Sequence, residues 1–313
     1  MAVTLPADVL CRYRRFTLYN SPYAAHDHGR AVDLYPGDAT HPDPVEGDPV
    51  AAPSPVAGEV IDTRTVAGPS RPYAADEDHL VVVDTAVGGG PTLAAEESPV
   101  ARLMHVDPAV EPGDRVAVGD SLGTLVRAGF FAPWVADHLH LGFRPRDADP
   151  YRASGSLPLA LDPDLELELV PVAWDGTGTV VAAGDTYAVL DRPRHPDPGG
   201  AFAGLAATVD GRVAGVLDGG LPHYDGGGLL APNDGQTADK PVELLGEPVG
   251  TASGRDVTWG DVTVLANDDP VRGLALAPAR DRLGVKLVGE AVDLPVGVEV
   301  TVRVTTLPND HVV

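Results

Sequence analysis

Short apolar runs bounded by turn residues constrain the fold of this chain more than any other feature. Runs such as residues 59–61, 79–83, 179–181 and 298–304 alternate or are rich in β-branched residues, whereas helix-period patterns are almost absent. The 36 glycines and 31 prolines supply the turns between them. The sequence therefore predicts an all-β protein.

The length of 313 residues favours two domains, because a single core rarely grows to that size. The polar, small-residue stretch 147–156 is the best candidate boundary, which predicts domains at 1–155 and 156–313. Asp210 and Gly211 separate two apolar runs and predict a tight hairpin. We expect the C-terminal domain to be a β-sandwich or barrel-like domain, and the sequence indicates no site within it.

The charge balance excludes several classes of partner. Asp and Glu total 46 against 22 Lys and Arg, for a formal net charge of -24, so repulsion opposes binding to nucleic acid and anionic lipid. Only two lysines occur and Asp is abundant, which is typical of halophilic proteins, although an acidic protein from a GC-rich genome has a similar composition. No signal peptide or membrane-spanning stretch is evident, so the predicted location is cytoplasmic. Cys11 is the only cysteine, so a metal must be held by His and carboxylate ligands.

Two histidine-containing segments carry the chemistry. His138 and His140 lie in the apolar run 135–143, where alternation along a strand would place both imidazoles on one face. Such a pair can share one metal or divide into a ligand and a general base, and it can also be a solvated strand face. The second segment, residues 24–36, contains His26, His28 and Asp33, and a carboxylate within an apolar run requires a cation. His105 ends a further apolar strand at 101–104.

The spacing of valines and glycines after His105 resembles a known family. The pattern Val110-x-x-Gly113-x-x-Val116-x-x-Gly119-x-x-x-Gly123, followed by the His138-x-His140 strand, is similar to the C-terminal half of the LytM/lysostaphin-type zinc endopeptidases (peptidase M23). The segment 47–60 resembles the Gly-x-Pro-Val hairpin of that family, and the resemblance covers about residues 25–150. It implies a duplicated-hybrid-motif β domain. The same ladder occurs in biotinyl/lipoyl-like barrels, but those need a Lys at a hairpin tip, and both lysines here follow residue 239.

Carried onto this sequence, the resemblance implies that His28, Asp33 and His140 bind one Zn²⁺ per chain with a water in the fourth position. It implies that His105 and His138 are catalytic residues, which assist proton transfer and stabilise the oxyanion. Four residues separate His28 from Asp33, where the family has three, so a bulge or turn at Gly29 must restore their convergence. His26 is the reserve ligand.

The function expected on this basis is a zinc-dependent metallopeptidase-like hydrolase acting on a peptide or peptide-containing substrate. Two alternatives remain open at this point. One is a catalytically degenerate LytM-like binding or scaffolding protein that acts through protein contacts, and the other is a purely structural metal site. The sequence does not indicate an oligomeric state.

Overall fold

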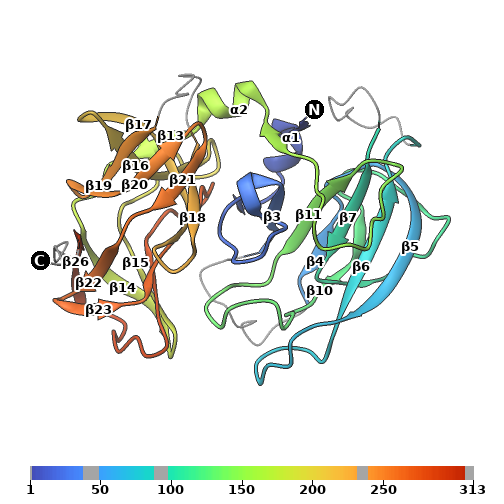
Figure 1. Cartoon of the computed structure of the whole chain (residues 1–313). Coiled ribbons are helices and arrows are strands. Elements are labelled where there is room, and N and C mark those ends of the chain that lie inside the picture. Colours follow the sequence, from blue (N-terminus) through green and yellow to red (C-terminus); the bar gives the residue numbers. More distant parts are fainter. Residues whose placement is uncertain (1, 38–48, 88–97, 231–238, 307–313) are drawn as a thin grey trace, which may run out of the picture. The chain divides into compact units, whose positions relative to one another are not determined.

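The computed structural model describes residues 2–37, 49–87, 98–230 and 239–306. The chain divides into two compact units: the first comprises 1–18 and 23–165, and the second comprises 19–22 and 166–313 (Figure 1). Both units are built almost entirely of strands, so the predicted all-β, two-domain class is confirmed. None of the helices in the described ranges has the length and apolarity that crossing a membrane requires.

Among the described residues, fourteen strands and short helices lie wholly within the first unit. They are β1 (Val3–Leu5), α1 (Ala7–Leu10), β2 (Arg15–Thr17), the 3₁₀ turn η1 (Asp27–Gly29), β3 (Ala31–Tyr35), β4 (Ala51–Pro53), β5 (Gly58–Ala67), β6 (Glu77–Asp84), β7 (Val100–Met104), β8 (Val106–Pro108), β9 (Arg115–Val116), β10 (Ser121–Leu125), β11 (Leu139–Arg144) and β12 (Leu159–Leu161). Helix α2 (Pro163–Glu168) follows and contains the division between the units.

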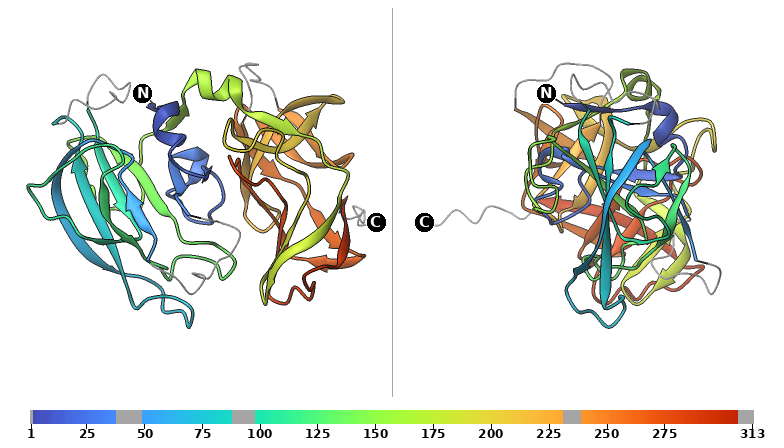
Figure 2. Two further views of the ribbon diagram at one scale, coloured as in Figure 1. Left: turned by 180° about the vertical axis from the view of Figure 1, so that it is seen from behind. Right: turned by 90° about the vertical axis from the view of Figure 1, so that its right-hand side faces the viewer.

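The main sheet of the first unit has seven strands in the order β2-β3-β11-β7-β6-β5-β9. Figure 1 labels β3, β11, β7, β6 and β5 of this sheet. Viewed from behind, its strands lie side by side and curve (Figure 2). Strand β11 lies between β3 and β7 and is buried along its whole length. One of its faces carries Leu139, Leu141 and Phe143, which alternate with the residues of the other face. This alternation leaves the second face for polar groups.

A smaller sheet, β4-β10-β8, accompanies the main one. Strand β4 pairs with β10 and not with β5, so the segment resembling a Gly-x-Pro-Val hairpin does not form a hairpin between β4 and β5; its first residues, 47 and 48, lie outside the described residues. The glycines of the Val/Gly ladder do mark turns. Gly113, Gly119 and Gly123 all have positive φ, and a Cβ on Gly123 would lie 1.9 Å from the Asp107 carbonyl oxygen.

The first unit extends beyond the predicted boundary at residue 155. Strand β12 pairs in parallel with β1, which ties residues 159–161 to the beginning of the chain. The division therefore falls after Leu165.

The second unit is a strand-rich, partly closed sheet. Its strands are β13 (Val170–Val172), β14 (Thr177–Gly184), β15 (Tyr187–Leu190), β16 (Ala203–Val209), β17 (Arg212–Leu221), β18 (Gly226–Leu230), β19 (Lys240–Leu244), β20 (Glu247–Ser253), β21 (Asp256–Trp259), β22 (Val262–Ala266), β23 (Asp269–Val271), β24 (Gly273–Leu276), β25 (Lys286–Val288) and β26 (Glu299–Thr306). An additional pairing between β16 and β17 closes β16, β19, β20, β21, β18 and β17 into a ring. This arrangement agrees with the barrel-like alternative of the prediction.

The hairpin predicted at Asp210 and Gly211 is present between β16 and β17. Both turn residues have positive φ, +52° and +71°, as a tight two-residue turn requires.

Candidate metal centre

Strands β3 and β11 place a carboxylate and an imidazole opposite each other. Asp33 and His140 are direct partners in the antiparallel ladder, so their side chains project from the same face of the sheet. The His140 Nδ1 atom lies 2.9 Å from Asp33 Oδ1. Both side chains are buried. The strand pairing alone therefore brings together two of the three predicted ligands, which are 107 residues apart in sequence.

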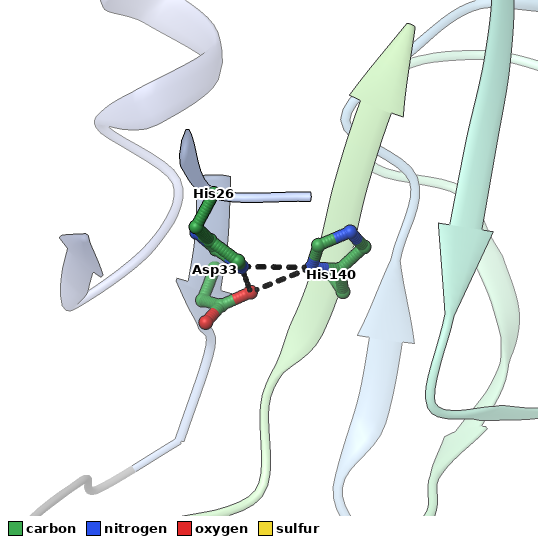
Figure 3. Close-up of side chains that lie close together, drawn as sticks. All are labelled: His26, Asp33 and His140. Carbon is green, nitrogen blue, oxygen red and sulfur yellow. Dashed lines mark hydrogen bonds and ion pairs between the residues drawn. The ribbon is translucent and has the colours of Figure 1, made fainter. Parts of the chain in front are cut away.

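The third member of the group is His26, not His28. His26 Nε2 lies 3.2 Å from Asp33 Oδ1 and 3.1 Å from His140 Nδ1, so the three donor atoms form a compact triangle (Figure 3). His26, Asp33 and His140 are all buried, and together they could hold a metal ion. The assignment of His28 as a ligand is thus corrected to His26, the reserve ligand.

The reason is the local backbone. His28 and Gly29 both have left-handed φ values, +56° and +63°, within the turn η1. Two successive left-handed residues reverse the chain just before β3 begins, and the Gly29 N–H donates to the His26 carbonyl oxygen to close the turn. A turn at Gly29 was predicted, but it carries His26 toward Asp33 and leaves the His28 side chain exposed.

A hydrogen bond fixes which nitrogen of His26 faces the group. A carbonyl oxygen only accepts, so His26 Nδ1 must donate its proton to the Leu18 carbonyl at 2.9 Å. In the neutral ring this leaves a lone pair on Nε2, the atom that faces Asp33. The His26 Nε2 lone pair and the Asp33 carboxylate therefore both face His140 Nδ1, which donates to them in the metal-free protein. A cation in the place of that proton would be bound by all three atoms, with the His140 proton moved to Nε2.

The size of the triangle fits a small metal ion. Nitrogen and oxygen ligands lie about 2.0–2.2 Å from Zn²⁺, so adjacent ligands in a tetrahedral site are roughly 3.3 Å apart. The three observed separations are 2.9, 3.1 and 3.2 Å. Small outward movements of the side chains would accommodate the ion.

His138 lies beside this group, one residue before β11 begins. Its Nδ1 donates to the Ala136 carbonyl at 2.9 Å, and its Nε2 lies 3.4 Å from Asp33 Oδ2. Phe131 stacks on the ring at 4.2 Å between centroids, which holds its orientation. His138 is therefore a buried imidazole whose unprotonated nitrogen faces the candidate metal site.

His105 directly follows β7, which pairs with β11 on the side away from β3 and Asp33. Its ring centroid lies 5.3 Å from that of His138 and 5.9 Å from that of His140. Its Nδ1 lies 2.7 Å from Asp78 Oδ2. Asp78 is 1% exposed, and its other oxygen accepts the His79 backbone N–H at 2.7 Å. The ionised carboxylate keeps the proton on His105 Nδ1, which leaves Nε2 free to accept one.

Sequence reasoning missed Asp78. The residue stands at the start of β6, and nothing in its local pattern points to His105, which is 27 residues away. Its signal is the same as that of Asp33: a carboxylate at the edge of an apolar run.

The protonation states suit metal binding at neutral pH. Burial alone would raise the pKa of Asp33, but the imidazoles of His138 and His26 and the hydrogen bonds at its oxygen hold this pKa well below its usual range. Burial lowers the pKa of His138 to about 4 and that of His140 to about 3. At pH 7 the carboxylate is therefore ionised and both imidazoles are neutral.

Comparison with family models matches both units of the chain. Residues 4–161 match the family described as the N-terminal domain of a "Domain of unknown function (DUF8155)", and residues 170–305 match the DUF8155 C-terminal domain. The two matches follow the division of the structure, with the junction in or next to helix α2. Neither the curated proteins nor the solved structures include a match to this chain.

Proposed function

The chain belongs to the DUF8155 family, and we propose that its N-terminal unit is a zinc-dependent hydrolase of the LytM/lysostaphin type that cleaves an amide bond. The observation that carries this proposal is the convergence of His26 Nε2, Asp33 Oδ1 and His140 Nδ1 within hydrogen-bonding distance of one another. The resemblance of the Val/Gly ladder and the His138-x-His140 strand to that family supports it.

Zinc is the metal that the donor set favours. Two imidazoles and one carboxylate, with a fourth position open, are typical of catalytic zinc, whereas Ca²⁺ and Mg²⁺ prefer oxygen ligands. When bound, zinc would polarise the amide carbonyl and make a water molecule acidic enough to ionise near pH 7.

We assign the proton transfers of the reaction to His138 and His105, and one hydrogen bond orients each ring for this role. Each has its Nδ1 proton held by an oxygen, Ala136 O for His138 and Asp78 Oδ2 for His105. Each can therefore accept a proton at Nε2 from the attacking water and return it to the leaving amine. A ring that has accepted a proton also stabilises negative charge developing on the carbonyl oxygen.

The substrate class proposed is a peptide or peptide-containing molecule, as the resemblance implies.

The test is the zinc content of the full chain, measured by mass spectrometry after dialysis in high-salt buffer. Wild type should hold about one zinc per chain, His26→Ala should lose it, and His28→Ala should retain it. The two substitutions remove the same side chain two positions apart, so His28→Ala is the matched control. Zinc retained by His26→Ala, or no stoichiometric zinc in the wild type, would refute the metal centre.

Catalysis requires a second measurement. Hydrolysis of a peptide library by the zinc-loaded protein should be lost in His138→Ala while zinc content and circular dichroism are retained. A zinc-loaded wild-type protein that cleaves no peptide would contradict the hydrolase proposal and favour the scaffolding alternative.

A further inference from the structure

Two buried arginines lie on the same face of the sheet as the metal centre. Arg102 of β7 is opposite Gly142 of β11, one same-face position from the pair formed by Met104 and His140. That step corresponds to about 7 Å along the strand. Arg144 is the next same-face residue of β11 after Gly142. The register therefore places two cationic side chains next to the candidate ligands.

The strand neighbours of Arg102 on this face of the sheet are mostly apolar. Leu80, Val82, Val100 and Met104 form a buried cluster on this face, and Val82 and Val100 flank Arg102. Arg102 is 7% exposed, and its Nε has no hydrogen-bond partner among the described residues. No carboxylate of the described chain lies within ion-pair distance of it. An unpaired guanidinium in such surroundings destabilises the fold unless a ligand completes it.

Arg144 has a different role. It is 1% exposed, and its terminal nitrogens donate to Ser156 Oγ and to the carbonyl oxygens of Arg152 and Ala153, which anchors the loop after β11. All of these partners are neutral. Arg144 therefore adds a second positive charge near Arg102. Burial and this charge lower the pKa of Arg102 to about 10, although the carboxylate of Asp78 raises it in part. Both groups remain cationic at neutral pH.

The acidic groups of this sheet face are already engaged. Asp33 belongs to the candidate metal centre and Asp78 accepts a hydrogen bond from His105. Asp62, opposite Val82, accepts hydrogen bonds from Arg64 and Tyr151, and Asp84 forms a two-point ion pair with Arg146 at 2.6 and 2.7 Å. In a chain with 46 acidic and 22 basic residues, a carboxylate partner for a buried arginine would be easy to supply. Asp78 attracts the Arg102 guanidinium, but no ion pair joins them among the described residues, and both oxygens of Asp78 already accept hydrogen bonds from His105 and the His79 N–H. A close anionic partner for Arg102 is therefore expected to come from outside the chain.

We infer that Arg102, supported by the charge of Arg144, binds a carboxylate of the molecule on which the metal centre acts. A guanidinium and a carboxylate match as planar groups through two parallel hydrogen bonds. This inference rests on the proposed function only in taking the bound molecule to be a substrate. Binding of the carboxylate itself requires no metal. The substrate class is thereby narrowed to peptides with a free carboxylate near the scissile amide.

The experiment compares two probes on the metal-free protein at one fixed salt concentration. N-acetyl-alanyl-alanine has a free carboxylate, and its C-terminal amide is the same molecule without the charge. By calorimetry or NMR titration, the wild type should bind the acid at least about ten-fold more tightly than the amide. Equal affinity for the two probes, or no binding of the acid, would overturn the inference. This comparison uses only the wild-type protein, so it does not depend on whether a variant folds.

Substitution then locates the site. Arg102→Met replaces the guanidinium with an unbranched apolar side chain that suits the apolar cluster, so it should abolish the preference for the acid while leaving Tm unchanged or higher. Arg115→Met, at an exposed arginine of β9, is the control and should keep the preference. A preference that survives in Arg102→Met, or a large fall in Tm with binding retained, would assign Arg102 a structural role and overturn the inference. These binding experiments use metal-free protein, so their outcome does not depend on the metal centre. The zinc content of the wild type and of His26→Ala tests the metal centre separately.

Discussion

Replacing Asp78 by asparagine tests the part of the site that depends on proton position. In the wild type both oxygens of Asp78 accept hydrogen bonds, from His105 Nδ1 and from the His79 N–H, each at 2.7 Å. An amide has one oxygen and one NH₂ group, so it can accept only one of these bonds. If its oxygen stays on the His79 N–H, its NH₂ faces His105, whose proton must then move to Nε2. His105 would lose the nitrogen that accepts a proton.

The expected cost to stability is modest. Asp78 is 1% exposed, and its pKa is held below the usual range because the effect of burial is outweighed by His105. A hydrogen bond to a charged group contributes about 1.5–3 kcal/mol and a neutral one about 0.5–1.5 kcal/mol. The difference predicts that Asp78→Asn lowers the free energy of unfolding by roughly 1–2 kcal/mol at pH 7. Urea titration followed by circular dichroism measures this change.

The effect on hydrolysis should be larger than the effect on stability. Proton transfer by a positioned base is worth about 10²–10⁴ in rate, so we expect at least a hundred-fold loss of kcat. The zinc content should be unchanged, because Asp78 and His105 lie outside the group of His26, Asp33 and His140. A variant that keeps full activity, or one that loses its zinc, would refute this reasoning.

Asp84→Asn is the matched control. Asp84 is on the same strand and is ion-paired with a half-exposed arginine, Arg146. Exposed pairs of this kind contribute about 0–1 kcal/mol, so the control should lose little stability and no activity.

Three further outcomes are expected. In the metal-free protein, the free energy of unfolding should fall as the pH drops from 6.5 toward 4, because His138 and His140 stay neutral in the folded state but take up protons in the unfolded state. Each histidine contributes up to about 1.4 kcal/mol per pH unit to this slope. Urea titration at several pH values measures the slope, and His138→Gln should reduce it. Gly123→Ala should destabilise the first unit far more than Gly113→Ala in thermal unfolding, because both have positive φ but only at Gly123 would a Cβ collide, with the Asp107 carbonyl oxygen. Removal of zinc by a chelator should lower Tm, and zinc restored at a hundred times its Kd should return about 2.7 kcal/mol of stability to the wild type and none to His26→Ala; equal response of the two proteins would count against the site.

The sequence by itself determined the class of structure and the short-range features. Alternating or β-branched runs predicted strands at 59–61, 79–83, 179–181 and 298–304, and strands β5, β6, β14 and β26 contain all of these residues except Val298. Asp210 and Gly211 predicted their hairpin, because a two-residue turn needs positive φ at both positions. Asp33 and His140 were recognisable as candidates because polar groups within apolar strands must find partners. These inferences depend only on neighbouring residues, which is why a sequence contains them.

Only the tertiary structure decided which groups meet. His26 replaces His28 because two left-handed residues reverse the chain before β3, and the spacing along the sequence does not report such a reversal. The first unit extends beyond residue 155 because β12 pairs with β1, which lies at the start of the chain. The roles assigned to Asp78 and Arg102 depend on strand β7 lying between β6 and β11. Contacts of this kind join residues far apart in the chain, and their positions follow from strand order and register, which no local pattern specifies.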